Sequence, residues 1–283
     1  MSLEAVARKD FQDAVRSRWL LGLTAFFVLL VSVVVYLVRP GEGQTLSTSA
    51  LLGSVFIRDA LVTTLIPLIA LVVSYNAVVG ERETGSLKLL LALPHSRADV
   101  VFGKVAGRAG AIAVPVSVGF LLPGLVAAIG PLSLRPFTFL GYILLTLLLS
   151  AAFVAIAVGF SAAVSSNRLA IGGAVGLYFL FVPLWGAIQF PLRLYLGTGG
   201  GPSWLPISGS SLLEVFRLVN PTGSFKIVAG EFVNGVLFAA GQAGTEAAGQ
   251  YATQMEIAAF AMLGAWLLVP PLLGLWRFEG ADL

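Results

Sequence analysis

Residues 80–97 read GERETGSLKLLLALPHSR, a charged segment that can form a helix and lies between two long apolar runs. Glu81 and Glu83 fall near the start of the expected helix, where negative charge is favoured by the helix dipole. The residue types that follow are typical of caps and turns, namely Thr84, Gly85 and Ser86. A polar insert of this kind in an apolar chain indicates a segment that lies outside the membrane and has a function of its own.

The leucines of this insert recur at helical spacing. Leu87, Leu90 and Leu91 form an apolar face with Lys88 opposite, and Pro94 ends the helix. Two interpretations stay open on these residues alone. The insert is either a solvated surface helix or a short helix whose leucines occupy a groove in a partner protein.

Composition restricts the class of protein. The chain has 283 residues, of which 58% are hydrophobic and 11% are charged, whereas soluble domains carry about 25% charged residues. The short alternating segments of a membrane barrel are not evident. The fold class predicted is therefore an all-α polytopic membrane protein in a lipid bilayer, with residues 1–283 as a single transmembrane domain.

Six uncharged runs approach or exceed the roughly 20 residues that a helix needs to cross a bilayer. They lie at 19–38, 60–79, within 109–134, within 137–165, at 169–190 and at 257–276. Because these cores contain no Asp, Glu, Lys, Arg or His, an ion-coupled pump is disfavoured.

Two further polar segments flank these runs. Residues 1–18 have apolar residues at helical spacing and predict a surface helix, with a plain polar tail as the alternative. Residues 191–256 form a large region between spans five and six. Within it, residues 227–241 are interpreted as an interfacial helix and not as a seventh span, because Glu231 and Asn234 interrupt the apolar run.

Basic residues set the orientation. With six spans, both termini and the charged insert share one side, which holds Arg8, Lys9, Arg16, Arg18, Arg82, Lys88, Arg97, Lys104, Arg108, Arg168 and Arg277. The other side holds Arg39, Arg58, Arg135, Arg193, Arg217 and Lys226. The positive-inside rule predicts a multi-pass protein of the cell membrane with both termini in the cytoplasm and 191–256 outside. This topology also explains the net charge of +3 without a nucleic-acid partner.

Catalytic and metal-binding sets are absent from the sequence. There is no cysteine, His95 is the only histidine, and Gly103-Lys104 lacks the other residues of a phosphate-binding loop. We expect no enzyme activity, no metal and no cofactor in this chain. Two small-residue pairs, Gly103/Gly107 and Gly172/Gly176, predict close helix packing.

The insert resembles the signature of the type-two ATP-binding-cassette permeases. The matching residues are Glu81-Arg82-Glu83, Gly85-Ser86-Leu87, Leu89-Leu90, Pro94, Ser96-Arg97 and Gly103-Lys104. The 1–18 helix, the 191–256 region and residues 220–225 (NPTGSF) are similar to the NosY-like subgroup.

This resemblance implies that residues 80–97 are a coupling helix between spans two and three, which docks on a separate cytoplasmic ATPase that uses ATP and Mg²⁺. The implied ATPase contacts are Glu81, Arg82, Glu83, Thr84, Gly85, Ser86, Leu87, Leu90 and Leu91. The resemblance also implies that the chain is an exporter permease, which works as a homodimer or with a second permease.

Two alternatives remain open at this stage. The first is an ion-coupled secondary transporter or a channel. The second is a membrane scaffold or maturation factor that transports nothing and holds an external partner protein through residues 191–256. The sequence does not identify a substrate-binding residue.

Overall fold

The protein is described here by a computed structural model that covers residues 2–41, 44–58, 61–92, 96–129, 132–197, 208–235, 237 and 246–280. In chain order the elements are α1 (Ser2–Val15), α2 (Arg18–Leu37), β1 (Leu46–Ser47), α3 (Thr48–Leu51), the π-helix η1 (Leu52–Arg58), α4 (Leu61–Ser74), α5 (Val79–Glu83), α6 (Ser86–Ala92), α7 (Arg97–Ile129), β2 (Leu132–Ser133), α8 (Pro136–Ala163), α9 (Asn167–Phe179), the π-helix η2 (Leu180–Leu184), α10 (Trp185–Gly197), α11 (Gly209–Val219), α12 (Pro221–Asn234) and α13 (Glu246–Glu279).

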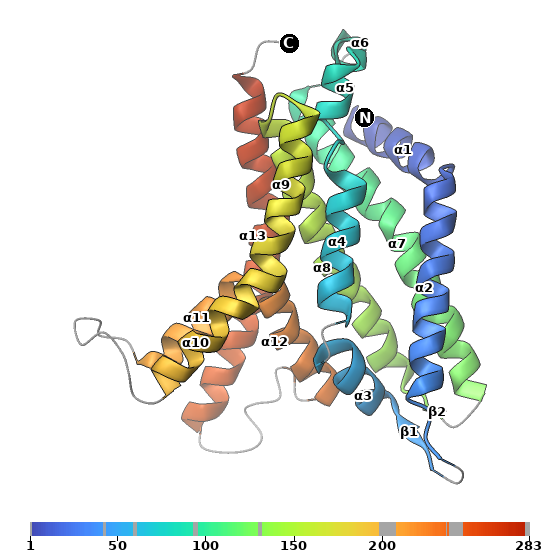
Figure 1. Ribbon diagram of the computed structural model, residues 1–283, viewed down its shortest axis with the longest axis vertical. Coiled ribbons are helices and arrows are strands. Elements are labelled where there is room, and N and C mark those ends of the chain that lie inside the picture. The colour runs from blue at the N-terminus through green and yellow to red at the C-terminus, as the bar shows by residue number, and fades with distance from the viewer. Residues whose placement is uncertain are drawn as a thin grey trace.

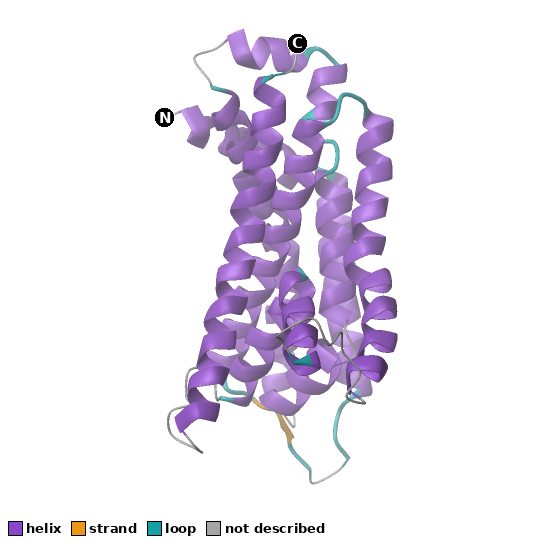
Figure 2. Ribbon diagram, turned by 90° about the vertical axis from the view of Figure 1, so that its left-hand side faces the viewer, coloured by secondary structure: helices purple, strands orange, loops and turns teal. Residues whose placement is uncertain are grey.

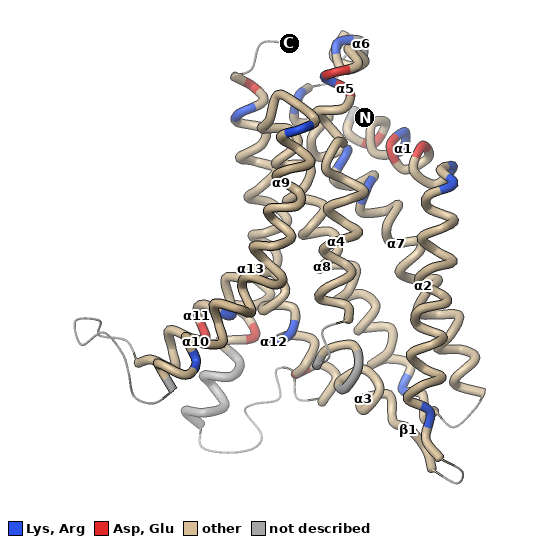
Figure 3. The backbone as a smooth tube through the Cα atoms, viewed as in Figure 1, with Lys and Arg blue, Asp and Glu red and all other residues tan. Residues whose placement is uncertain are grey.

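Six helical stretches of the described chain are long and apolar enough to cross a membrane, which confirms the predicted helical class with six spans. Figure 1 shows both termini, α5 and α6 at the upper end of the bundle, and the strands β1 and β2 at the lower end. Figure 2 shows the same bundle from the side as an elongated, almost wholly helical body. Lys, Arg, Asp and Glu gather toward the two ends (Figure 3), as expected when the central band faces lipid.

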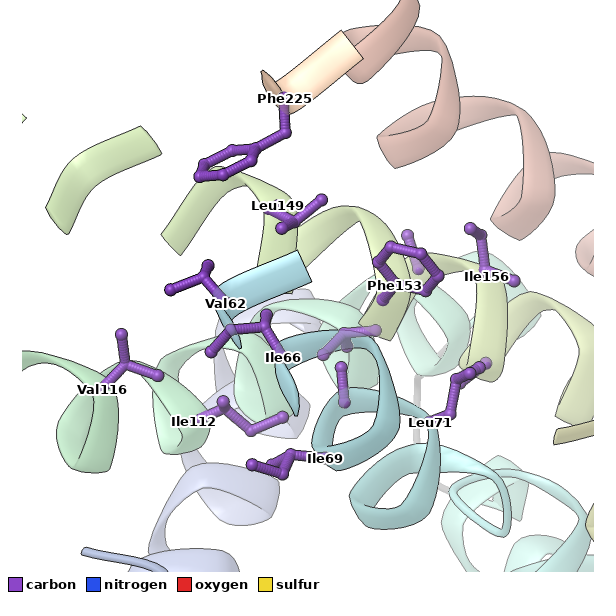
Figure 4. Packing of buried hydrophobic residues seen from close by; sticks show 14 of the residues in the cluster. Val62, Ile66, Ile69, Leu71, Ile112, Val116, Leu149, Phe153, Ile156 and Phe225 are labelled. Atoms are coloured by element: carbon purple, nitrogen blue, oxygen red, sulfur yellow. The ribbon is translucent and has the colours of Figure 1, made fainter. Parts of the chain in front are cut away.

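The core lies where α4, α7 and α8 meet (Figure 4). Ile66 of α4, Ile112 of α7 and Phe153 of α8 are all fully buried there. Helix α8 is the most enclosed of the spans, because α4, α7, α12 and α13 all pack against it. It is therefore the central helix around which the other spans are placed.

The third span differs from its prediction. Helix α7 begins at Arg97 and ends at Ile129, about three turns earlier at its start than the apolar run at 109–134 indicated. Pro115 and Pro123 both lie inside this helix without ending it. The early start places Lys104 and Arg108 in the first turns of α7, before its apolar core at 109–134, which contains no ionisable residue.

The N-terminal segment forms the predicted helix, α1, and packs its apolar face on α7. A side chain at Gly103 would lie 2.8 Å from Val6, and one at Gly107 would lie 2.8 Å from the backbone oxygen of Ala7. The close packing predicted for this glycine pair is therefore confirmed, with α1 of the same chain as the partner. At Gly172 a side chain would meet nothing within 4 Å, and Gly176 is equally open.

The polar region between the last two spans is shorter than predicted. Helix α10 continues the fifth span to Gly197, and α13 begins at Glu246. Between them α12 has 14 residues, about 21 Å at 1.5 Å per residue, and it ends at Gly235 with a φ of 75°. It is too short to span about 30 Å of hydrocarbon and is buried against α8 and α13. Residue 236 and residues 238–241, which belong to the segment interpreted as interfacial, lie outside the described residues.

The NPTGSF stretch makes the turn between α11 and α12. Asn220 accepts bonds at Oδ1 from the backbone N–H and hydroxyl of Thr222, both at 2.8 Å, and donates Nδ2–H to the Phe181 carbonyl at 2.8 Å. A side chain at Gly223 would lie 1.9 Å from the Arg217 carbonyl oxygen, so the turn requires glycine there. Phe225 is fully buried and packs edge-on against Tyr142. The turn is thereby fixed inside the bundle.

Gly107→Ala is expected to destabilise the protein, because the added methyl group would clash with the backbone of α1 at Ala7. The cost is about 1–3 kcal/mol of unfolding free energy, typical of overpacking. Gly22→Ala on α2 is the matched control, since nothing lies within 4 Å of that position. Removing a helical glycine there should stabilise by up to about 1 kcal/mol.

Thermal denaturation of the purified protein in detergent measures both variants. Shifts of the midpoint in opposite directions support the α1–α7 seat. A rise for both variants would contradict it.

Candidate functional site

The charged insert folds as two short helices, α5 and α6, at the upper end of the bundle (Figure 1). We call this segment, residues 79–92, the α5–α6 segment. The helix of the second span stops at Ser74 and restarts at Val79 after a turn, so backbone groups on both sides of the break need partners from elsewhere.

Two side chains from neighbouring helices satisfy this break. The hydroxyl of Ser161 on α8 accepts from the backbone N–H groups of Val78 and Val79, at 3.1 Å each. Arg108 on α7 donates to the carbonyl of Val73 at 3.0 Å. The N-cap residue Val78 has no capping side chain of its own, so α8 supplies the cap and holds the start of α5.

Glu81 joins the segment to α1 and α7 through a buried ion cluster. Lys104 Nζ lies 2.9 Å from Glu81 Oε1 and 3.7 Å from Asp10 Oδ1. Arg108 Nε lies 2.9 Å from Asp10 Oδ2, and Lys9 Nζ lies 3.7 Å from Glu81 Oε1. We call Lys9, Asp10, Glu81, Lys104 and Arg108 the ion cluster.

Burial makes the ion cluster costly to disrupt. Lys104 is 2% exposed and Asp10 is 6% exposed. A buried charge without its partner loses hydration without compensation, which typically destabilises by about 3–5 kcal/mol. Lys104 lies between two carboxylates and so holds α1, α5 and α7 in one arrangement.

Arg82 and Glu83 point to other helices. Arg82 donates to the carbonyl of Val164, the C-cap of α8, at 3.0 Å, and its guanidinium lies 5.3 Å from the ring centre of Phe278 on α13. Glu83 Oε1 accepts from the backbone N–H of Asn167, the first residue of α9, at 2.7 Å. A cation at one helix C-terminus and an anion at a helix N-terminus both match the helix dipoles.

Arg97, which ends the insert, holds the last turn of α13. Its guanidinium donates to the carbonyls of Phe278 and, at 2.9 Å, of Glu279, and it lies 5.1 Å from the Phe278 ring centre. Since these carbonyls lie at the C-terminal end of α13, the arginine satisfies groups that have no partner within the helix.

A glycine turn separates α5 from α6. Gly85 has a φ of 74°, which only glycine adopts readily, and its N–H donates to the Arg82 carbonyl at 3.2 Å. The hydroxyls of Thr84 and Ser86 lie 2.9 Å apart, and Thr84 donates to the Gly80 carbonyl at 3.0 Å. The expected turn and cap roles of these three residues are confirmed.

The leucine face of the insert points inward. Leu87 is 1% exposed and belongs to the core, and Leu90 packs against the core while half-buried. Lys88 is exposed on the opposite face, as predicted, together with Thr84. The side chain of Leu91 is outside the described set. Pro94 and His95 also lie outside the described residues.

The residues singled out from the sequence therefore divide into two groups. Glu81, Arg82, Glu83 and Leu87 contact other helices of the same chain, whereas Thr84 and Lys88 face outward and Gly85 and Ser86 are half-buried. Sequence reasoning missed three partners, namely Asp10, Arg108 and Ser161. One signal was present in the sequence: Lys104 and Arg108 each directly follow a glycine of the Gly103/Gly107 pair, which places both cations beside a close helix contact.

The polar contacts of this site are structural ones between helices. Among the described residues there is no group of three or more His, Asp or Glu side chains that could hold a metal ion. The ion pairs and helix caps instead connect the α5–α6 segment to α1, α7, α8, α9 and α13.

Comparison with known proteins gives consistent matches over most of the chain. The sequence profile described as ABC-2 family transporter protein matches residues 4–283. A protein named probable ABC transporter permease protein NosY from Pseudomonas aeruginosa is 35% identical over 239 residues, covering 81% of this chain and 84% of the relative. A protein of the same name from Stutzerimonas stutzeri is 31% identical over 223 residues, covering 77% of this chain and 80% of the relative.

Lys104→Met is expected to lower the free energy of unfolding by about 1–3 kcal/mol. Asp10 and Glu81 lose a buried counter-charge, but Arg108 and Lys9 remain beside them. Lys88→Met is the matched control. Its side chain is exposed, so the expected change is within about 0.5 kcal/mol.

Chemical denaturation in detergent micelles, followed by tryptophan fluorescence, measures both changes. If Lys104→Met were as stable as the control, the ion cluster would not carry the stability that its burial implies.

Proposed function

The chain belongs to the ABC-2 family of transporter proteins and is a multi-pass membrane permease subunit, and from this premise we propose that a separate ATPase drives it through the α5–α6 segment. The ATPase binds ATP and Mg²⁺ and carries out hydrolysis, while this chain moves the cargo. In this proposal the α5–α6 segment is the coupling helix. The proposed direction is export, in line with the resemblance of its signature to exporter permeases.

The observation that carries the proposal is how firmly the α5–α6 segment is tied to the spans. Glu81, Arg82 and Glu83 contact three different sets of helices, so a displacement of the segment displaces their ends together. A motor protein that pushes on the exposed face would therefore move the whole upper end of the bundle. The exposed face available to it includes Thr84 and Lys88, with the half-buried Gly85 and Ser86 between them.

The same geometry refines the proposed ATPase contacts. Leu87 is buried in this chain, so it supports the coupling helix from behind and does not enter a groove on the ATPase. Glu81, Arg82 and Glu83 likewise act as anchors to the permease helices. For this reason Leu87→Asp would damage the fold and is not a clean test of docking.

The proposed orientation places the upper end of Figure 1 in the cytoplasm. Both termini and the α5–α6 segment lie at that end, where an ATPase could reach the segment. The majority of basic residues, by the topology of six spans, belong to the same side, which is the side favoured by the positive-inside rule.

We further propose that two permeases pair through the outward face of α9. Most residues of the fifth span are not buried within this chain. Leu169, Val175 and Phe179 are about half exposed, and Gly172 and Gly176 leave room for a second helix. A homodimer and a pair with a different permease are both compatible with this face.

The ion-coupled alternative has less support. The charged groups of the ion cluster are already paired with one another near the end of the bundle, and such closed pairs do not offer a binding site for a travelling ion. The scaffold alternative keeps one feature in its favour, because α12 is built into the bundle and could transmit movement to an external partner.

Lys88→Glu is expected to reduce recovery of the ATPase with the affinity-tagged permease at least tenfold, because it reverses the charge on the proposed docking face. Arg168→Glu is the control, since Arg168 is exposed in the first turn of α9 at the same end. The measurement is co-purification from native membranes, with quantitative mass spectrometry and ATP hydrolysis as readouts.

Recovery that is unchanged by Lys88→Glu would refute this docking face. Cargo transport by the purified permease alone, driven by an ion gradient, would refute coupling to an ATPase.

A further inference from the structure

Helices α10, α11 and α12 enclose a small polar cavity away from the α5–α6 segment. The indole of Trp185 on α10 stacks on Phe216 of α11, with ring centres 4.4 Å apart, and donates to the Phe216 carbonyl at 3.2 Å. Trp266 of α13 donates to the carbonyl of Val219 at 2.8 Å. These contacts fix the walls of the cavity, because they join the α11–α12 turn to two spans.

The cavity has a volume of about 260 Å³ and receives one cation from each of the three helices, namely Arg193 of α10, Arg217 of α11 and Lys226 of α12. Gln189 and Thr222 add an amide and a hydroxyl to the lining. Figure 3 shows basic positions on all three helices in this part of the molecule. None of the described residues that line this cavity is acidic.

The three cations have no ion-pair partner within the described residues. Glu214, Glu231 and Glu256 line a neighbouring cavity on the other side of Arg217 and Lys226. Burial lowers the pKa of Lys226, and the charges of Arg217 and Arg193 lower it further. The three positive charges therefore repel one another across the cavity, although Glu231 and Glu214 offset part of this repulsion at Arg217. An anion placed among the three cations would reduce the repulsion that remains.

We propose that this cavity is a binding site for a single oxyanion of the phosphate or sulfate type. Two guanidinium groups suit such a group because each presents paired N–H donors, and an ammonium adds a compact point charge. The volume lies below the roughly 300–1,000 Å³ of sites for drug-sized ligands, so the site takes one small anionic group. The site lies within this chain and does not depend on the proposed ATPase coupling.

The oxyanion has two possible sources, a free anion or the phosphate of a lipid headgroup. Arg193 and Gly186 are exposed on the α10 wall, which leaves a way in for either source. The shared chemistry is the same set of contacts, so the two sources are separated by experiment.

The first arm measures binding of inorganic phosphate and of sulfate to the full-length protein in detergent, by isothermal titration calorimetry at constant ionic strength. Arg193→Gln and Lys226→Gln are each expected to raise the dissociation constant at least tenfold. Arg135→Gln is the control, because Arg135 is exposed and does not line the cavity. It should change the constant less than twofold.

The same variants give a readout that a purely structural role would not produce. Without added anion, Arg193→Gln and Lys226→Gln should raise the thermal midpoint, because each removes one of three repelling charges. Arg193 is exposed, so its substitution is expected to leave the packing intact. Arg193→Gln therefore still tests the proposal if Lys226→Gln fails to fold.

The second arm uses native mass spectrometry of protein purified with its lipids. Phospholipid that stays bound to the wild type and to Arg135→Gln, and is lost from Arg193→Gln and Lys226→Gln, would identify the lipid phosphate as the source. Phosphate binding in the first arm would identify a free anion. Equal behaviour of wild type, variants and control in both arms would overturn the proposal.

Discussion

The upper end of the bundle depends on one buried ammonium group, that of Lys104. It lies between the carboxylates of Glu81 on α5 and Asp10 on α1. In a low-dielectric surrounding neither carboxylate is stable without a counter-charge. The lysine therefore links α5 to α1 and α7, while Ser161, Arg82 and Glu83 hold the α5–α6 segment against α8 and α9.

Helix ends make up the rest of this joint. The break between α4 and α5 leaves backbone donors and acceptors unpaired, and Ser161 and Arg108 satisfy them from α8 and α7. Arg82, Glu83 and Arg97 then bind the ends of α8, α9 and α13 in the same way. The polar groups at the ends of the spans are thus shared between neighbouring helices, which makes the end of the bundle a single connected unit. The cavity between α10 and α12 is the opposite case, because three cations line it and none of them forms an ion pair among the described residues.

The sequence predicts the helical class, six spans, the turn at Gly85 and the exposed Lys88, because hydropathy, glycine and helical spacing are local signals. It does not show that the helix of the third span begins as early as Arg97. Lys104 and Arg108 look like solvent-exposed cations until Asp10 and Glu81 are known to neutralise them. Local sequence patterns also do not show that Glu81, Arg82 and Glu83 contact other helices of the same chain, because their partners lie on five different elements. The glycine pair at Gly103 indicated a close neighbour without identifying α1 as that neighbour.

The seat of α1 on α7 has a consequence for the order of synthesis. Asp10 leaves the ribosome long before Lys104 and Arg108 exist, and at about 5–20 residues per second this interval is on the order of 5 to 20 seconds. During that time α1 has neither the glycine groove of α7 nor the counter-charges of Lys104 and Arg108. Helix α1 is therefore made well before α7 and can be fixed in its final place only after α7 has been synthesised.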